Sequence, residues 1–169
     1  FFTPEISKSQ GTVYEHAARA LDLAMKRTSK NGLPLILGGD WNDGMNNVGV
    51  EGRGERGGRG WFVLKAIEEM AAIAREQGDT PRADRWERHA GEVKRALEGS
   101  AWDGEWYRRG SFDDGSPLGS KKSDECKIDS IAQSWSVISG VADPARAERA
   151  MAARDRHLVR RDDGLVLLL

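Results

Sequence analysis

Apolar side chains recur every three or four residues along most of the chain, which is the spacing of one buried face of an α-helix. No stretch shows a regular array of alternating polar and apolar positions, and no alternation of strands with helices is apparent. The pattern therefore predicts an all-α chain built from helix pairs. The predicted helices run from Thr12 to a stop at Asn31-Gly32, from Trp61 to Glu76, from Thr80-Pro81 to Gly99, from Lys127 to Ser139, and from Asp143-Pro144 to about His157.

Local signals mark several of these helix ends. Thr12 and Glu15 have the spacing of a capping box, in which each residue bonds the other's backbone N–H. Thr80 and Pro81 are typical of a cap followed by a first helical residue. Because only a short turn around Gly78 separates the second predicted helix from the third, these two helices are expected to form an antiparallel hairpin.

One segment, residues 101–119, departs from the helical pattern. It is rich in aromatic residues and contains two Asp-Gly pairs, which favour tight turns between strands. We expect a small β-hairpin excursion here. Its aromatic residues Trp106, Tyr107 and Phe112 either line a pocket or seal the ends of the helices.

A short apolar run leads into the most chemically distinctive stretch, residues 33–49. Two glycines follow the run, and then come Asp40, Trp41, Asn42 and Asp43. An indole face can stack on a sugar ring while carboxylates and amides bond its hydroxyl groups, and an adjacent apolar ring raises the pKa of a carboxyl group. The pattern thus fits a carbohydrate site with a proton donor.

Two other interpretations of that stretch stay open. Asp, Asn and Gly form turns for purely local reasons, and a single Trp often fills a core. A calcium loop fits poorly, because Gly44 and Met45 stand where a ligand and the required glycine belong. No cluster of Cys and His suggests zinc either, so we expect no metal.

Two further regions offer candidate chemistry. Asp129 and Gln133 lie four residues apart and share a helix face, so they either point into a cleft or serve as a solvated acid and a buried amide. The glycine-rich residues 44–60 are expected to be a lid or a long connection. Their single Arg-Gly-Gly triplet resembles RNA-binding segments, but Glu51 and Glu55 offset its charge.

Composition narrows the class of protein. The chain has 169 residues with 38% hydrophobic and 31% charged, which is typical of a folded globular unit. The net charge of −1 provides no field that would attract nucleic acid, and the single Cys126 excludes an internal disulfide. The chain begins Phe-Phe-Thr-Pro and ends in the apolar run 165–169, so we expect residues 1–169 to be one partial domain of a longer protein.

Three motifs together resemble the catalytic domain of glycoside hydrolase family 94. They are LPLILGGDWNDGMNNVG at 33–49, WDGEWYRRGSFDDGSPLGS at 102–120 and ECKIDSIAQSWSVISG at 125–140. The likeness is strongest to the phosphorylase-like region of cyclic β-1,2-glucan synthases, and cellobiose-type phosphorylases share the core of the pattern. The resemblance implies that the chain is part of an (α/α)6 toroid.

The resemblance also implies an activity, namely inverting phosphorolysis of β-glucosidic bonds, with β-1,2-linked glucan as the expected substrate. Inorganic phosphate would be the co-substrate, the product would be α-glucose 1-phosphate, and no cofactor would be needed. The family's proton donor matches Asp43, and its sugar subsite residue matches Trp41. Asp40, Asn42 and Gln133 are further expected substrate-binding residues. A phosphorylase needs only one carboxylic acid, because phosphate is itself the nucleophile.

The partners expected from the resemblance are a β-glucan oligosaccharide, phosphate and the rest of the parent catalytic domain, with no nucleic acid. A cyclic glucan synthase parent would also carry a membrane-bound glycosyltransferase region. The expected location is the cytoplasm or the cytoplasmic side of the inner membrane. A carbohydrate-binding helical domain without catalysis, and an Arg/Gly-loop RNA module, are the alternative functions.

Two features depart from the family pattern. Relatives usually have Gly-Glu-Ser-Val-Trp where this chain has glycines and arginines at 54–60, which puts the packing of that segment in question. The family's phosphate-binding groups lie largely outside this window, and His157 does not match the family's histidine. We therefore expect the isolated chain to lack a complete phosphate site.

Overall fold

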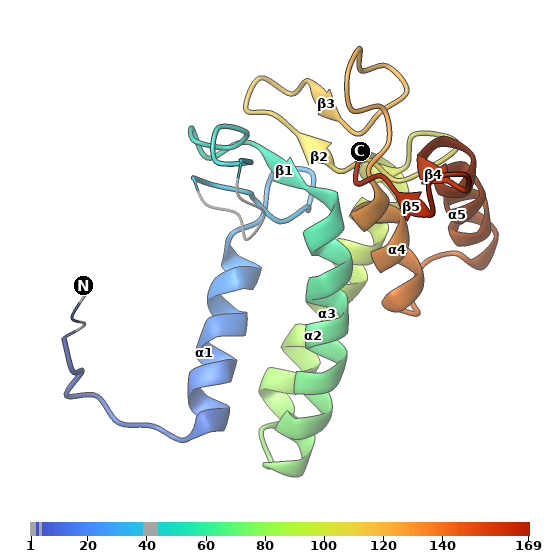
Figure 1. Cartoon of the computed structure of the whole chain (residues 1–169). Coiled ribbons are helices and arrows are strands. Elements are labelled where there is room, and N and C mark those ends of the chain that lie inside the picture. The colour runs from blue at the N-terminus through green and yellow to red at the C-terminus, as the bar shows by residue number, and fades with distance from the viewer. Residues whose placement is uncertain (1–2, 4, 39–43) are drawn as a thin grey trace.

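The computed structural model describes residues 3, 5–38 and 44–169 of the chain, and the fold of this part is mostly helical (Figure 1). A five-residue π-helical turn, Leu97–Ala101, continues the third helix. The helices are α1 (Val13–Lys26), α2 (Gly57–Glu76), α3 (Thr80–Ala96), α4 (Ser130–Ile138) and α5 (Pro144–Leu158). The prediction of helix pairs with a small β element is confirmed.

Short strands form two small antiparallel sheets in the described residues. In the first, β2 (Gly110–Ser111) lies between β1 (Glu55–Arg56) and β3 (Pro117–Leu118). The second pairs β4 (Val159–Arg160) with β5 (Leu165–Val166). The β2–β3 pair is the hairpin predicted within residues 101–119. The remaining strand of this sheet, β1, was not predicted, because a two-residue strand inside a glycine-rich segment has no periodic signal.

The first helix starts as predicted and ends earlier. Thr12 accepts a hydrogen bond from the backbone N–H of Glu15 at 3.2 Å, and the Glu15 carboxylate accepts from the Thr12 N–H at 2.7 Å, which confirms the capping box. The helix ends at Lys26 instead of near Asn31, because the backbone of Thr28 pairs with that of Pro34. The turn between them passes through Gly32, whose φ of +82° suits glycine.

Asp residues cap the three later helices; the cap at Asp143 is confirmed, whereas the starts of α3 and α4 differ slightly from those predicted. Asp79, one residue before Thr80, accepts from the Arg82 N–H and caps α3, and Asp143 accepts from the Arg146 N–H and caps α5. Asp129 accepts from the N–H groups of Ile131 and Ala132, so α4 begins at Ser130 and not at Lys127.

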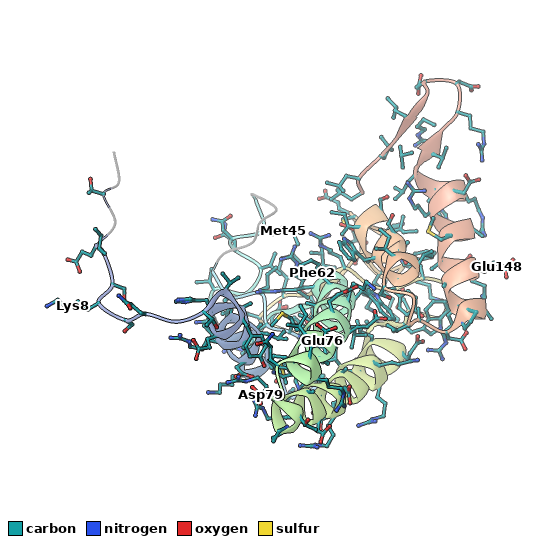
Figure 2. The ribbon with its side chains drawn as sticks, turned by 90° about the horizontal axis from the view of Figure 1, so that it is seen from below. Lys8, Met45, Phe62, Glu76, Asp79 and Glu148 are labelled. Atoms are coloured by element: carbon teal, nitrogen blue, oxygen red, sulfur yellow. The ribbon has the colours of Figure 1, made fainter. Side chains whose placement is uncertain are left out.

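Helix α2 forms the centre of the packing. It packs against α3 and α4, and more lightly against α1, while α4 packs against α5. Its fully buried Trp61 meets Tyr107 edge to face, with ring centroids 5.0 Å apart. In Figure 1 the three-stranded sheet lies at one end of α2 and α3, and the turn joining these two helices lies at the other. Figure 2, seen from below, labels Glu76 and Asp79, the residues on either side of that turn.

The glycine-rich segment is partly regular, which corrects its prediction as one long lid or connection. Residues 55–56 are β1, and residues 57–60 are the first turn of α2. A Cβ at Gly57 would lie 2.6 Å from the carbonyl oxygen of Arg108, so glycine allows this close approach. Arg56 of the Arg-Gly-Gly triplet is 3% exposed, which leaves its side chain out of reach of an RNA partner.

No helix in the described ranges is long and apolar enough to span a bilayer.

Candidate active site

The predicted acid and sugar-binding residues Asp40, Trp41, Asn42 and Asp43 lie outside the described residues. The structure describes what holds the chain immediately before and after them. It also describes where the 102–120 and 125–140 motifs meet that part of the molecule.

The segment that leads into the motif lies against β1. The N–H of Arg56 donates to the carbonyl of Pro34 at 2.9 Å, and the N–H of Ile36 donates to the carbonyl of Gly54 at 2.9 Å. An antiparallel bridge joins Leu35 to Glu55 between these bonds. Because β1 also pairs with β2, the sheet connects the 33–49 and 102–120 motifs through β1.

Ile36 fixes this segment by close packing. Its side chain is 1% exposed and lies against Gly49 and Gly54, in the segment by which the chain returns to the sheet after the motif. A Cβ at Gly49 would lie 2.0 Å from Ile36 Cγ2, and a Cβ at Gly54 would lie 2.6 Å from the carbonyl oxygen of Val48. Any larger residue at these two positions would displace the returning chain.

The chain that follows the motif is bound by Asp113, which lies just after β2. The Asp113 carboxylate accepts hydrogen bonds from the N–H groups of Glu51, Arg53 and Gly54, each at 2.8 Å. The Asp113 N–H donates to the carbonyl of Val48 at 3.1 Å. The sequence predicted no role for Asp113, because the turn signals in residues 101–119 are the Asp103-Gly104 and Asp114-Gly115 pairs.

A buried ion pair lies beside the same sheet. Arg109, which directly precedes β2, is 1% exposed, and its Nη1 lies 3.3 Å from Oδ1 of Asp129 at the start of α4. Burial raises the pKa of Asp129, although the charge of Arg109 and the two backbone N–H groups of the helix start oppose that shift. This pair joins the 102–120 and 125–140 motifs, and the sequence had no signal that specified it.

Gln133 is fully buried and its amide bonds backbone groups. Its Oε1 accepts from the Tyr107 N–H at 2.9 Å, and its Nε2 donates to the carbonyls of Tyr107 and Asp129 at 2.8 and 2.9 Å. A substrate contact through Gln133 stays a prediction, but this geometry favours the buried-amide interpretation. Asp129 likewise faces the interior instead of solvent.

The aromatic residues of the β excursion mostly close the helix ends. Tyr107 is fully buried, and Trp106 is 4% exposed with its Nε1 donating to the carbonyls of Gly119 and Lys127, both at 3.0 Å. Phe112, by contrast, is 36% exposed and lines a cavity of about 360 Å³ with residues 116–118 and 122–126. Cys126 also lines it, and burial raises the pKa of its thiol, which disfavours a nucleophilic role.

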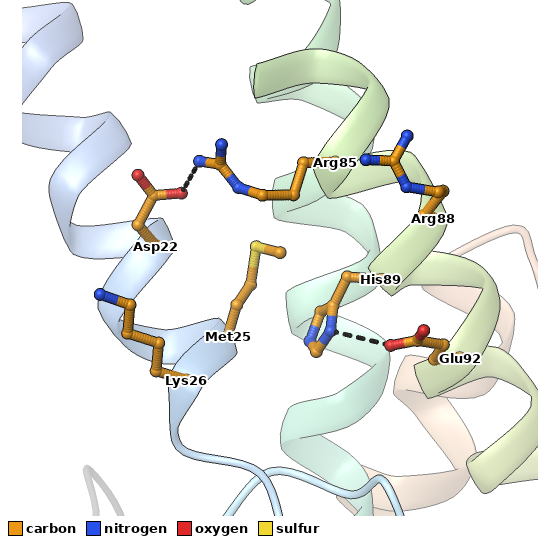
Figure 3. Close-up of a pocket in the computed structure, with 7 residues that line it drawn as sticks. All are labelled: Asp22, Met25, Lys26, Arg85, Arg88, His89 and Glu92. Carbon is orange, nitrogen blue, oxygen red and sulfur yellow. Dashed lines mark hydrogen bonds and ion pairs between the residues drawn. The ribbon is translucent and has the colours of Figure 1, made fainter. Parts of the chain in front are cut away.

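A separate cleft of about 460 Å³ opens between α1 and α3 (Figure 3). An ion pair between Asp22 and Arg85 at 2.8 Å spans it, and Asp22 also accepts from Trp86 Nε1 at 2.7 Å. None of its lining residues belongs to the three motifs, so the cleft is a junction between helices and not part of the candidate site. The lining residues are Asp22, Met25, Lys26, Arg85, Arg88, His89 and Glu92.

Metal ligands do not gather in the part of the chain that the structure describes, where no group of three or more His, Cys, Asp or Glu could hold an ion. The described frame binds the chain on either side of the Asp-Trp-Asn-Asp sequence. The sheet holds residues 34–36, and the Asp113 carboxylate and backbone hold residues 48–54, while the buried ion pair lies beside the same sheet.

Comparison with known proteins identifies the class of enzyme domain to which this frame corresponds. Residues 2–169 match the glycosyl hydrolase 94 superfamily, catalytic domain, and the chain belongs to that family. This confirms the family assignment made from the three motifs.

The relatives include a synthase and several phosphorylases. The chain is 52% identical over 168 residues, 99% of its length, to the cyclic β-(1,2)-glucan synthase NdvB of Rhizobium meliloti (strain 1021), of which the match covers 6%. It is 34% identical over 149 residues, 88% of its length, to the 3-O-β-D-glucopyranosyl-β-D-glucuronide phosphorylase of Paenibacillus borealis, of which it covers 19%. It is 35% identical over 158 residues, 92% of its length, to the cellobionic acid phosphorylase of Neurospora crassa, of which it covers 20%. The chain thus spans between about a twentieth and a fifth of these relatives.

Proposed function

We propose that this chain is the acid-bearing part of a glycoside phosphorylase or cyclic glucan synthase that acts on β-glucosidic bonds. The observation that carries the proposal is the 52% identity over 168 residues to a cyclic β-(1,2)-glucan synthase, together with the intact Asp-Trp-Asn-Asp sequence. This likeness supports a β-1,2-linked glucan as substrate.

Asp43 is the general acid in this proposal. It protonates the glycosidic oxygen of the departing sugar as the bond from that oxygen to the anomeric carbon breaks. A phosphate oxygen attacks the anomeric carbon from the opposite face, so β-linked glucose leaves as α-glucose 1-phosphate. Phosphate is already an anionic nucleophile, so no second carboxylate has to activate water.

The neighbouring residues bind and orient the sugar. Trp41 provides a stacking face for the ring, and Asp40 and Asn42 bond its hydroxyl groups. An indole beside Asp43 also disfavours the charged carboxylate, which keeps the acid protonated until it is used. Gln133, the other residue expected to bind substrate, has its amide bonded to the Tyr107 backbone, so in this proposal it positions that backbone and does not contact the sugar.

The remainder of the parent domain supplies what this segment lacks, above all the phosphate site. The reaction uses inorganic phosphate as co-substrate and no organic cofactor or metal. A cytoplasmic location, or the cytoplasmic side of the inner membrane with an attached glycosyltransferase region, follows if the parent is a cyclic glucan synthase.

Replacing the acid tests the proposal in the parent protein. Asp43→Asn keeps the side-chain volume and removes the proton donor, so turnover of β-1,2-glucan with phosphate should fall by about 10²- to 10⁴-fold. Release of glucose 1-phosphate is the measurement, and circular dichroism should be unchanged. Near-normal turnover in Asp43→Asn would assign the acid to another residue.

A further inference from the structure

The carboxylate of Asp113 binds a distant segment of the chain, although Asp113 lies next to the Asp114-Gly115 turn signal. It lies 59 to 62 residues along the chain from the three N–H groups that it binds. Oδ1 accepts from Arg53 and Gly54, and Oδ2 accepts from Glu51. Three backbone N–H groups can bind one carboxylate only if the chain turns so that all three point toward it, so this arrangement requires a defined backbone conformation.

The backbone of Asp113 adds two more bonds to the same segment. Its N–H donates to the Val48 carbonyl at 3.1 Å, and its carbonyl accepts from Arg53 Nε at 3.0 Å. The turn that brings the donors together passes through Gly52, which has φ of +79°, and closes with a bond from the Gly52 N–H to the Gly49 carbonyl at 3.0 Å. We call these five bonds between Asp113 and residues 48–54 the Asp113 clamp.

The clamp reaches both sides of the acidic motif. Residues 48–54 are the fifth to the eleventh residues after Asp43. Gly54, whose N–H donates to Asp113, accepts at its carbonyl from the N–H of Ile36, two residues before the Gly-Gly pair. Gly54 therefore links Asp113 to the segment that enters the motif as well as to the one that leaves it.

The charge of Asp113 persists at neutral pH. Desolvation by itself would raise the pKa of this carboxyl group, but the three N–H donors and the charge of Arg53 hold it below its ordinary value. The carboxylate thus stays an acceptor for all three bonds over the pH range in which a phosphorylase with a protonated general acid would work.

We propose that Asp113 is a positioning residue, which fixes residues 48–54 and through them the placement of the general acid Asp43. This inference rests on the proposed function. Asp113 itself touches no substrate in this proposal. Because misplacing a catalytic group by about 1 Å can cost about 10²-fold in rate, loosening the clamp should lower kcat without weakening substrate binding.

The chain supplies a matched control in the next residue. Among the described residues, the Asp114 carboxylate bonds the N–H and hydroxyl of Ser116, at 2.8 and 2.6 Å, inside the β2–β3 turn. Asp113→Ala and Asp114→Ala remove the same charge from the same turn. Only Asp113→Ala removes the acceptor of Glu51, Arg53 and Gly54.

The experiment uses the full parent protein with β-1,2-glucan and inorganic phosphate. For Asp113→Ala we expect kcat to fall about 10- to 100-fold with KM within twofold, while Asp114→Ala stays within twofold in both. Amide hydrogen exchange in a peptide covering residues 48–56 should accelerate in Asp113→Ala and not in Asp114→Ala. Asp113→Asn, which keeps one oxygen for Arg53 and Gly54, should fall between the wild type and Asp113→Ala.

Two results would overturn the inference. One is accelerated exchange in Asp113→Ala with kcat within twofold of wild type, and the other is a rise in KM that accounts for the whole loss of kcat/KM. If Asp113→Ala fails to fold, the same criteria apply to Asp113→Asn.

Asp43→Asn, measured in parallel, separates the two proposals. Full turnover there overturns the proposed function, whereas low turnover there with normal Asp113 variants overturns the clamp alone.

Discussion

Replacing Gln133 with Met should destabilise the fold strongly, because the Gln133 amide binds both backbone groups of the buried Tyr107. Met has a similar volume, so the change leaves little cavity and isolates the hydrogen bonds. The Tyr107 N–H and carbonyl, bound at 2.9 and 2.8 Å, would both lose their partner in a residue that is fully buried. An unsatisfied buried group costs about 1–3 kcal/mol, so the expected loss is about 2–6 kcal/mol.

Chemical denaturation followed by tryptophan fluorescence measures this loss, since Trp61 and Trp102 both contact the Tyr107 ring. Ser134→Ala is the control on the same helix. Its hydroxyl donates to the Ser130 carbonyl at 2.8 Å, and removing a donor to an acceptor within a helix should cost about 1 kcal/mol or less.

The opposite outcome would restore the role expected from the sequence. If Gln133→Met unfolds at the same denaturant concentration as the wild type but binds β-glucan more weakly, Gln133 contacts the substrate. The reasoning from buried backbone groups would then be refuted.

Two further predictions concern stability. Burial alone would raise the pKa of Asp103, but hydrogen bonds from Arg108, the Lys121 N–H and Ser120 hold this pKa below its ordinary value of 3.8. The ionised Asp103 therefore stabilises the fold fully above about pH 4, and this stabilisation is lost as the pH falls through the lowered pKa. Unfolding midpoints at pH 7 and pH 3 should therefore differ less in Asp103→Asn than in the wild type, and an equal difference would contradict this assignment. Gly57→Ala places a Cβ 2.6 Å from a carbonyl oxygen and should destabilise by about 1–3 kcal/mol, whereas Gly99→Ala, with nothing within 4 Å, should be nearly neutral in the same denaturation assay.

Local chemistry explains what the sequence could predict of the fold. Thr12 and Glu15 bond each other three residues apart, so the start of α1 depends on no distant contact. The end of α1 was misplaced because pairing of Thr28 with Pro34 is decided by how the chain returns along β1. Strand β1 was missed for a related reason, since Glu55 and Arg56 become a strand only beside Ser111 and Gly110.

The candidate site shows the same division between local and distant contacts. The Asp-Trp-Asn-Asp stretch is contiguous, so a sugar site could be considered beside a simple turn from its residues, and the family resemblance then pointed to Asp43 as the proton donor. Asp113 belongs to an Asp-Asp-Gly sequence whose local interpretation is a turn, and Asp114 does form that turn with Ser116. A carboxylate that binds N–H groups some 60 residues away leaves no mark in the spacing of residues.

The α2–α3 hairpin leaves the sheet at β1 and returns to the adjacent strand, β2, after more than fifty residues. Because the pairing of β1 with β2 fixes both ends of this excursion, a change in the length of the two helices at their far end would leave the strand pairing unchanged. Its distal turn, around Gly78, is therefore a natural point for inserting a fluorescent label or a short peptide tag, and for homologous chains to gain or lose whole helical turns.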